Sequence, residues 1–579
     1  MDMKIFGKYM NWVNSAYIDE KDREELKSIA KDKKEIEDRF YTDLSFGTGG
    51  IRGVRGVGCN RINKYVIRKA TQGLANYINE VAGEDESKKS CAIAYDCRIG
   101  SEEYALNTAL VLAANGIKAY LFKTLHSTPE LSFAVRALGA QAGVVITASH
   151  NPQEYNGYKV YWNDGCQLVE PQASAVVNHV NAVIDFDMIK LVSKKKALEK
   201  ERLIMIDESM DTSYINAVKK QVMNAEIPGK DQFKIVYTPL HGTGGRPVLR
   251  MFDEVGFKSV YPVAEQLQGD GMFPTCPYAN PEDPAVFKLG IELAEKVSSK
   301  LVMANDPDAD RIGIACKSKK GEWVYPNGNQ MGLLLMNYIL ENRKEIPKNG
   351  AVISTIVSTP MLDVIAKEKG VKIFRTLTGF KYIGEKIREF ETGAIDGEYL
   401  FGFEESYGYL IGTHARDKDA VVSTMIIAEM AAKYESEGID ILEELESLYN
   451  KYGWYKEGIT AITKKGKDGM AEISKIMSGL AKLKDTREII GKKVAIFRDF
   501  KEQVEVDFTI NACRRLELPK SDVIQFVFDD CTYITARPSG TEPKIKYYYC
   551  VTEKTETLAE EKLARVKADF EGFVENEIS

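Results

Sequence analysis

The chain has 579 residues, of which 44% are apolar and 28% charged, with a net charge of −7 and only five histidines. At about 150 residues per domain, this length predicts about four domains. The composition is typical of a folded globular protein and excludes a disordered or fibrous one. The acidic balance argues against a nucleic-acid partner, so an anionic ligand must be bound by locally concentrated Arg and Lys.

The first residues, Met1–Lys4, mix charges and lack the apolar core of a signal peptide. No run of about 18 apolar residues occurs, so we expect a cytoplasmic protein without a membrane partner. The nine cysteines show no C-x-x-C spacing. Reduced thiols are therefore favoured over a disulfide framework or a zinc site.

One α/β unit recurs three times after a charge-rich amphipathic segment, Asp19–Arg39, which predicts helices packed on the first domain. In each unit a short β-branched or aromatic run leads through a polar or Gly/Pro loop into a helical pattern. Such alternation predicts mixed, largely parallel sheets covered on both faces. The strand and helix pairs are Cys91–Tyr95 with Glu102–Ala114, Phe233–Tyr237 with Val248–Val255, and Ala351–Ser354 with Met361–Glu368.

The pattern changes after about residue 451, where a Lys/Glu-rich segment, an alternating strand at Gln503–Phe508 and a helix from about Thr557 to Glu575 predict a smaller α+β domain. The predicted fold class is therefore α/β, with three similar α/β units and a different fourth domain. We expect the domains at residues 1–210, including the N-terminal helical extension, 211–325, 326–450 and 451–579.

The segment Thr147–Pro152 follows the apolar run Ala142–Ile146, as a tight loop follows a buried strand. Such a loop displays the Ser149 hydroxyl for chemistry. His150 comes next and Lys159 lies further along, and both can transfer protons or stabilise the charge of a phosphoryl group. A structural polar turn remains the alternative for this segment taken alone.

Three aspartates at alternate positions follow the apolar run Leu301–Ala304 and precede Arg311: Asp306, Asp308 and Asp310. An EF-hand is excluded, because Arg311 replaces the required glycine and Lys317 replaces the bidentate glutamate. The pattern fits three monodentate carboxylates that bind Mg²⁺ beside a phosphate-binding guanidinium. A haloacid-dehalogenase-type phosphatase with an aspartate nucleophile, and a structural turn with solvated carboxylates, remain as alternatives.

Four further loops carry polar groups that suit a sugar phosphate. Gly402–Gly408 holds two carboxylates and a hydroxyl that can bind sugar hydroxyls, and Arg416–Asp419 is a salt-bridged helix start or a binding segment. Arg537–Lys546 combines hydroxyls, cations and a glycine turn, which suits a dianionic phosphate or is simply a turn between strands. Phe46–Gly53 is a similar cationic, glycine-rich loop.

Taken together, these loops resemble the α-D-phosphohexomutase superfamily of phosphoglucomutases and phosphomannomutases, over about residues 44–550 and in the family's order. The resemblance implies four domains around a central cleft, the first three built alike. It also implies that Ser149 carries a phosphoryl group and shares Mg²⁺ with the three aspartates. A lid motion of the last domain would shield the phosphoenzyme from water.

The implied reaction is phosphoryl transfer from Ser149 to O6 of glucose 1-phosphate, reorientation of glucose 1,6-bisphosphate, and return of the 1-phosphoryl group to Ser149. Lys159 is the first candidate for the general base and His150 the second. Glu404 and Ser406 would bind the sugar hydroxyls, and Arg311 the transferring phosphate. The remaining implied substrate-binding residues are Arg52, Thr378, Gly379, Lys381, Lys418, Arg537, Ser539, Gly540 and Thr541.

One departure from the family pattern concerns the sugar loop, where Phe403 stands before Glu404 in place of the usual glycine. The resemblance still favours glucose phosphates, and phosphopentomutase or phosphomannomutase activity by the same mechanism is the alternative. The Arg537–Lys546 loop argues against a phosphatase, because a phosphatase needs no second phosphate-binding site. Retention of Ser149 and all three aspartates argues against a catalytically silent scaffold protein.

Overall fold

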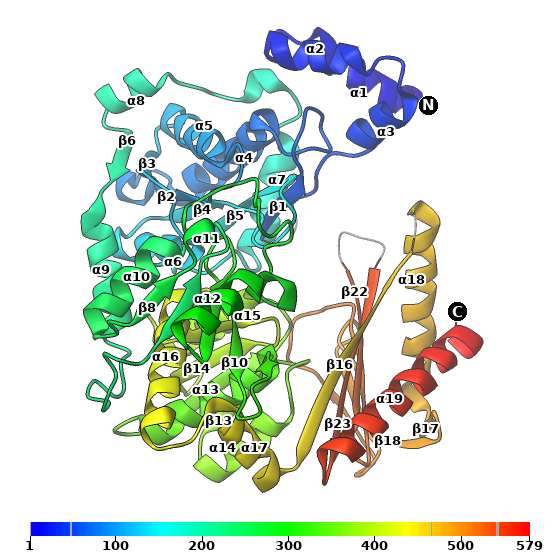
Figure 1. Cartoon of the computed structure of the whole chain (residues 1–579). Coiled ribbons are helices and arrows are strands. Elements are labelled where there is room, and N and C mark those ends of the chain that lie inside the picture. The colour runs from blue at the N-terminus through cyan, green and yellow to red at the C-terminus, as the bar shows by residue number, and fades with distance from the viewer. Residues whose placement is uncertain (1, 47–48, 465, 540–543, 579) are drawn as a thin grey trace.

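The computed structural model describes residues 2–46, 49–464, 466–539 and 544–578. Within these residues, four β-sheets follow one another, and the first three are packed together while the fourth stands to one side (Figure 1). Among the described residues, no helix combines the length and apolarity needed to cross a bilayer.

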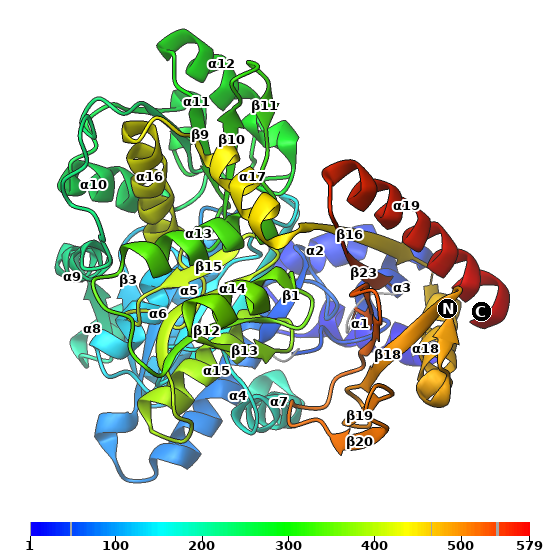
Figure 2. The same cartoon turned by 90° about the horizontal axis from the view of Figure 1, so that it is seen from below.

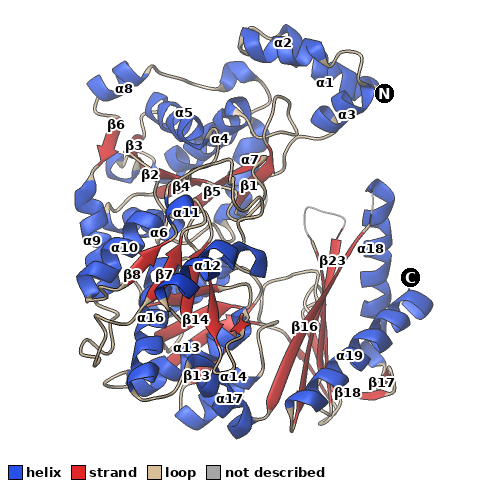
Figure 3. Ribbon diagram, in the orientation of Figure 1, coloured by secondary structure: helices blue, strands red, loops and turns tan. Residues whose placement is uncertain are grey.

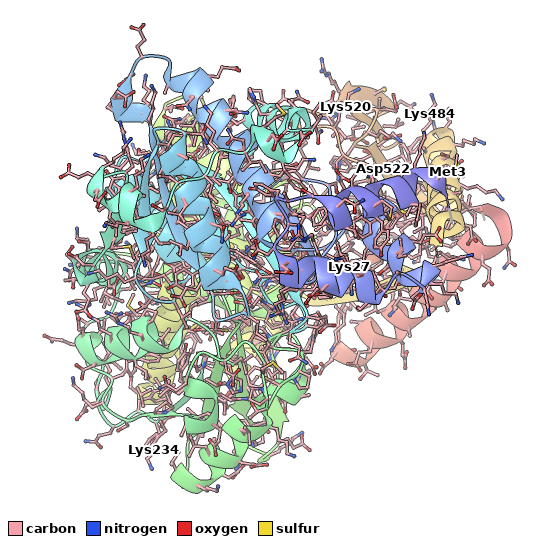
Figure 4. All side chains as sticks on the ribbon, turned by 90° about the horizontal axis from the view of Figure 1, so that it is seen from above. Met3, Lys27, Lys234, Lys484, Lys520 and Asp522 are labelled. Atoms are coloured by element: carbon pink, nitrogen blue, oxygen red, sulfur yellow. The ribbon has the colours of Figure 1, made fainter. Side chains whose placement is uncertain are left out.

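The N-terminal extension consists of three helices, α1 (Met3–Asn14), α2 (Glu20–Ser28) and α3 (Lys33–Phe40). The predicted amphipathic segment is confirmed as α2 and α3, whereas α1 was not predicted. The aromatic rings of Trp12 and Phe40 pack together, and Trp12 packs against Tyr65 at the start of α4 (Lys64–Ala82). The Tyr65 hydroxyl donates to Asp22 over 2.6 Å. Seen from above, α1 and α2, marked by Met3 and Lys27, extend over the fourth domain (Figure 4).

The first sheet has the order β1-β5-β4-β2-β3-β6 and is mixed. Helices α4, α5 and α7 share its larger apolar core, and α6 packs on the opposite face. The elements are β1 (Gly50–Val54), α4 (Lys64–Ala82), η1 (Glu86–Lys88), β2 (Ser90–Tyr95), α5 (Ser101–Ala114), β3 (Lys118–Phe122), α6 (Thr128–Ala137), β4 (Ala142–Ile146), β5 (Tyr155–Trp162), α7 (Gln172–Ala182), η2 (Phe186–Met188), α8 (Lys194–Glu199) and β6 (Leu203–Ile206).

The second sheet has the order β11-β10-β9-β7-β8, and one apolar core runs from it into the third domain. Its elements are α9 (Glu208–Lys219), β7 (Ile235–Thr238), α10 (Gly245–Val255), β8 (Val260–Pro262), α11 (Ala264–Leu267), η3 (Pro284–Phe287), α12 (Lys288–Val297), β9 (Leu301–Asn305), β10 (Ile312–Lys317) and β11 (Trp323–Val324).

The third sheet has the order β13-β12-β14-β15 and is flanked by long, largely buried helices. Its elements are α13 (Gly328–Asn342), β12 (Gly350–Thr355), α14 (Met361–Lys369), β13 (Lys372–Thr376), α15 (Phe380–Glu391), β14 (Glu398–Glu404), β15 (Gly408–Ile411), α16 (Ala420–Ser436) and α17 (Ile441–Tyr452).

The first three sheets share one arrangement of four strands. A central strand lies between two parallel neighbours, and the fourth strand pairs antiparallel with one of these neighbours. The arrangement is β5-β4-β2-β3, then β10-β9-β7-β8, then β15-β14-β12-β13. The predicted repeat of one α/β unit is therefore confirmed, as is the α/β fold class. In each unit the last two strands form a hairpin, so the β4–β5, β9–β10 and β14–β15 loops are topologically equivalent.

The fourth domain is a twisted antiparallel sheet with α18 and α19 on its outer face (Figures 2 and 3). Its elements are β16 (Trp454–Thr463), α18 (Gly466–Ala481), η4 (Lys482–Asp485), β17 (Glu488–Ile489), β18 (Lys492–Asp499), β19 (Val504–Asp507), β20 (Ala512–Arg515), β21 (Ile524–Phe528), β22 (Tyr533–Pro538), β23 (Lys544–Glu553), α19 (Glu556–Phe573) and η5 (Val574–Ile578). The predicted strand at 503–508 and the C-terminal helix are confirmed as β19 and α19. A small apolar cluster of Leu377, Phe500 and Val523 joins this domain to the third.

His126 joins the first domain to α9 through a buried ion pair. Its Nε2 lies 2.9 Å from Asp211 Oδ1, and its Nδ1 lies 2.9 Å from the carbonyl oxygen of Thr124. Since both ring nitrogens face acceptors, the geometry favours the doubly protonated ring. Burial lowers the pKa of His126, but Glu130 and Asp211 outweigh it and raise the pKa above its usual value.

This ion pair predicts a pH-dependent contribution to stability. A raised folded-state pKa means that the contribution is fully present below about pH 6.5 and is lost as the pH rises through the folded pKa of His126. We therefore expect His126→Gln to lower the melting temperature by about 2–4 °C near pH 6 and by less near pH 8.5. Thermal unfolding at the two pH values measures this difference.

The matched control is His179→Gln, which removes a partly exposed histidine 3.0 Å from Glu80 and should change the melting temperature little. An equal effect of His126→Gln at both pH values would contradict the charged ion pair.

Candidate active site

Two of the equivalent hairpin loops meet at a hydroxyl and a carboxylate. Ser149 lies on the β4–β5 loop and donates from Oγ to Asp306 Oδ2, on the β9–β10 loop, over 2.9 Å. The first and second domains therefore place the two strongest candidates from the sequence in direct contact. Both side chains are buried.

Ser149 has a left-handed backbone, with φ of 53°. A residue with a Cβ adopts this conformation only at a cost of about 1–3 kcal/mol, so neighbouring contacts must hold it. The amide of Ser149 donates to Thr147 Oγ1 over 2.8 Å. The strained turn directs the hydroxyl at the aspartates.

The three aspartates form a compact acidic cluster whose ligand oxygens lie within 4.8 Å of one another. Burial, and then the charges of Asp310 and Asp308, raise the pKa of Asp306 well above its usual value. One oxygen each of Asp308 and Asp310, Oδ1, is buried without a hydrogen-bond partner. Unsatisfied, mutually repelling carboxylate oxygens at this spacing fit a hard divalent cation.

Two lysines partly compensate this negative charge. Lys159 Nζ lies 2.8 Å from Asp308 Oδ2 and 3.5 Å from Asp310 Oδ2, and Lys418 Nζ lies 3.1 Å from Asp310 Oδ2. Burial lowers the pKa of Lys159, but Asp308 and Asp310 outweigh it and raise the pKa. Lys159 is therefore held as an ammonium ion in this arrangement. Lys418 reaches the cluster from the third domain.

His150 Nδ1 lies 3.3 Å from Ser149 Oγ. Burial, and then the nearby Arg311 and Arg52 guanidinium groups, lower the pKa of His150 well below its usual value. The ring is therefore neutral at physiological pH and can accept a proton beside the serine.

Two guanidinium groups, those of Arg52 and Arg311, lie near His150 of the serine loop. Arg52 donates from Nη1 to Asn151 Oδ1 over 2.9 Å and is otherwise exposed. Arg311 donates from Nη1 to Glu282 Oε1 over 2.7 Å, while its Nε is buried without a hydrogen-bond partner. A buried guanidinium N–H without a partner is an available donor for a phosphoryl oxygen. The predicted loop Phe46–Gly53 is wrong in its second half, because Gly50–Val54 form β1 and Arg52 lies on this strand. Gly47 and Thr48 lie outside the described residues.

The third domain brings its two predicted sugar-binding loops together. The amide of Gly379, which has φ of 121°, donates to Glu404 Oε1 over 2.7 Å. Thr378 and Ser406 are half-buried on these loops. Lys381 Nζ lies over the Tyr382 ring, 4.9 Å from its centroid.

Arg537, near the end of β22 in the fourth domain, lies close enough to Glu405 of the third domain to affect its carboxylate. Burial, and then the charge of Glu404, raise the pKa of Glu405, and Arg537 acts in the opposite direction as a nearby positive charge. The amide of Ser539 donates to the carbonyl oxygen of Lys544 over 2.7 Å, which closes the base of the hairpin. Gly540 and Thr541 lie outside the described residues.

Models of the phosphoglucomutase/phosphomannomutase family match three parts of this chain. Alpha/beta/alpha domain I matches residues 43–185, domain II residues 212–321 and domain III residues 327–452. The phosphoglucomutases of Staphylococcus epidermidis and Staphylococcus aureus are each 36% identical to the chain, over 518 and 526 residues. These matches cover 89% and 90% of this chain and 92% of each relative. The chain belongs to the phosphoglucomutase/phosphomannomutase family.

Solved structures of this family have the same fold. A phosphoglucomutase/phosphomannomutase family protein of Burkholderia thailandensis has a TM-score of 0.66 at 18% identity, covering 93% of this chain and 99% of that one. Parafusin, a phosphoglucomutase of Paramecium in an open form, has a TM-score of 0.65 at 19% identity, covering 91% and 94%. The resemblance drawn from the loops is therefore confirmed.

Sequence reasoning missed two residues that contact the predicted site residues. Thr128 donates from Oγ1 to Asp308 Oδ2 over 2.9 Å, and Glu282 accepts from Arg311. Neither stands in a pattern that distinguishes it from an ordinary cap or turn, and only the folded chain brings them to the site. Asp417, in the predicted segment Arg416–Asp419, has Oδ1 3.0 Å from Lys418 Nζ.

Proposed function

We propose that this protein is a phosphoglucomutase, which interconverts glucose 1-phosphate and glucose 6-phosphate through phosphorylated Ser149 and a glucose 1,6-bisphosphate intermediate. The observation that supports this most directly is the contact of Ser149 Oγ with a buried cluster of three aspartates, two of which carry unsatisfied oxygens. The 36% identity to phosphoglucomutases over most of the chain supports glucose as the sugar.

Mg²⁺ is the cation that best suits a cluster of three monodentate carboxylates beside a phosphoryl group. Asp306, Asp308, Asp310 and phosphorylated Ser149 would hold it. When bound, it would neutralise the charge that develops as the phosphoryl group transfers.

The transfer breaks the bond between phosphorus and Ser149 Oγ and forms one between phosphorus and O6 of glucose 1-phosphate. The O6 proton must pass to a nearby base, and Ser149 Oγ takes a phosphoryl group again in the second half of the reaction. Neutral His150 can accept that proton, while Lys159, held as an ammonium ion, stabilises the transferring charge and becomes a base once its proton is lost. We propose both as the proton-transfer groups.

The intermediate must turn end for end, so both of its phosphates need a binding site. Arg311 and Arg52 would grip the reacting phosphate, and Glu404 and Ser406 the sugar hydroxyls, with Thr378, Gly379, Lys381 and Lys418 beside them. The other phosphate would be bound by the fourth domain, whose motion would admit and release the sugar. The residues of this second grip are Arg537, Ser539, Gly540 and Thr541.

The alternatives are phosphopentomutase and phosphomannomutase by the same chemistry. The departure at Phe403 does not favour them, because this side chain is fully buried and packs against α13, where a Cβ on Gly332 would lie 2.3 Å from its ring. Glu404, the next residue on the strand, points to the opposite face. The family's binding surface is thus unchanged by Phe403.

We also propose a cytoplasmic location, small sugar phosphates as partners with neither nucleic acid nor a membrane, and the domain limits 1–210, 211–325, 326–450 and 451–579. The strands of the four sheets fall within these limits, although α9 and α17 cross two of them.

Ser149→Ala should abolish the interconversion, because it removes the phosphoryl acceptor and little packing. Phosphorus NMR measures the result with Mg²⁺, a trace of glucose 1,6-bisphosphate and a mixture of glucose, mannose and ribose 1-phosphates. The unmodified protein should convert the glucose ester without release of inorganic phosphate. Faster conversion of another sugar would favour an alternative mutase, growth of inorganic phosphate would favour a phosphatase, and an active Ser149→Ala protein would rule out the covalent route.

Lys159→Met should lower kcat by about 10²–10⁴-fold and change KM little, because the ammonium group stabilises charge during transfer. Steady-state kinetics measure both constants. Lys234→Met, on the exposed surface of the second domain, is the control (Figure 4). A rise in KM at unchanged kcat would instead make Lys159 a substrate contact alone.

Asp308→Asn should weaken Mg²⁺ binding by more than about 10-fold, because it removes a charged ligand. Isothermal titration calorimetry measures the affinity. Asp253→Asn, an exposed change in α10, should leave it unaltered. Equal affinities for the two variants would place the cation elsewhere.

A further inference from the structure

A buried arginine beneath the serine loop has no role in the chemistry proposed above. Arg98 lies in the loop after β2, and its side chain has no exposed surface. Its counterion is Asp96, whose Oδ2 lies 3.3 Å from Arg98 Nε. Arginine is rarely this buried unless its donors are used.

The guanidinium group binds four carbonyl oxygens of the serine loop. Nη2 donates to the carbonyl oxygen of Ser149 over 2.6 Å and to that of Asn151, while Nη1 donates to Pro152 over 2.8 Å and to Tyr155 over 3.0 Å. The planar fork thus ties together the whole turn between β4 and β5. A lysine has one nitrogen and three donors, so it cannot span the same carbonyl groups.

These contacts hold the part of the loop that is strained. Ser149 has φ of 53°, its amide is held by Thr147 Oγ1, and its carbonyl group is held by Arg98. The backbone is therefore fixed on both sides of the Cα atom that carries the reacting hydroxyl. Without the second tie, a left-handed serine would relax toward an ordinary conformation.

Asp96 fixes the orientation of the Arg98 side chain. Its Oδ1 accepts from the amide of Arg98 over 3.0 Å and from Ser101 Oγ over 2.8 Å, at the start of α5. Asp96 is itself buried. The serine loop is thus connected through a fixed ion pair to the first turn of a helix.

The same arginine faces the second domain. Its guanidinium carbon lies 5.1 Å from the centroid of the Phe273 ring, and Gly271 packs so closely that an added Cβ would lie 2.6 Å from the amide of Ile99. Asp270 donates its amide to the carbonyl oxygen of His241 over 3.0 Å. Thr243, two residues after His241, contacts the aspartate loop, because its amide donates to the carbonyl oxygen of Pro307 over 2.9 Å.

We propose that Arg98 is a positioning residue that sets the place of Ser149 Oγ relative to the aspartate cluster. It touches neither substrate nor reacting atoms, and acts through the serine loop on one side and the second domain on the other. This inference rests on the proposed phosphoryl transfer through Ser149.

The test is the variant Arg98→Lys, which keeps the positive charge but loses the planar guanidinium group that binds the four carbonyl oxygens. The variant and the unmodified protein are incubated with glucose 1,6-bisphosphate, and the fraction that takes up a phosphoryl group is counted by intact-protein mass spectrometry. Turnover of glucose 1-phosphate is then expressed per phosphorylated site. We expect kcat per site to fall about 100-fold, as for a misplacement of about 1 Å, with KM changed little.

Arg61→Lys is the matched control. Arg61 is also a buried arginine, and it binds backbone carbonyl groups of Asp38 and Asn60, but at the N-terminal extension. Its substitution should leave kcat per phosphorylated site unaltered. A merely structural role for Arg98 would lower the melting temperature and the phosphorylated fraction while kcat per site stays normal, and that result would overturn the inference.

If Arg98→Lys does not fold, Asp96→Asn replaces it, since it keeps the shape of the anchor and removes its charge. A fall of about 10-fold in kcat per site is then expected, and an unchanged value would overturn the inference. Failure of the unmodified protein to take up a phosphoryl group would instead overturn the proposed function, and with it the role of Arg98.

Discussion

The structure depends on keeping three carboxylates buried within 4.8 Å of one another. Such a cluster is strongly unfavourable unless hydrogen bonds and positive charges compensate it. The compensation comes from Ser149, Thr128 and Lys159 in the first domain and from Lys418 in the third. The aspartates of the second domain need partners from the first and third domains, and this need holds the three domains in one arrangement.

The repeated α/β unit explains why such distant residues can meet. One polar loop in each of the first three domains connects the same two strands of the shared arrangement, so each unit presents this hairpin loop from an equivalent position. The serine loop, the aspartate loop and the loop with Ser406 are these three hairpins. The fourth domain has a different fold, yet Arg537 and Ser539 also stand where two antiparallel strands, β22 and β23, meet. In all four domains, predicted site residues thus stand at the connection of two antiparallel strands, with different side chains in each domain.

The sequence predicted what is local and missed what depends on long-range contact. Ser149 and Asp306 could be found because each follows an apolar strand in a recognisable pattern. Thr128 and Asp308 are 180 residues apart, so nothing near either residue indicates their hydrogen bond. Thr128 reads only as the start of α6, and Arg98 reads only as one charge in a loop. Phe403 is the opposite case. Its departure from the family pattern is visible in the sequence, but its side chain is buried in the core.

The domains are joined by contacts of unequal strength, and this matters for a substrate with two phosphates. One apolar core spans the second and third domains, and buried ion pairs join the first domain to the second and the second to the third. The Tyr161 hydroxyl of the first domain also donates to buried Asp417 of the third over 2.7 Å. The fourth domain is joined to the third by a small cluster around Phe500, by Tyr455 and Cys550 in the larger apolar core, and by a hydrogen bond from Gln525 Nε2 to the carbonyl oxygen of Ile356 over 2.9 Å. Separating the first three domains would expose uncompensated buried charges, which costs far more than opening these uncharged contacts. Under the proposed function, Ser149 would therefore stay fixed against its aspartates, and movement that admits, reorients or releases a sugar phosphate would fall to the fourth domain.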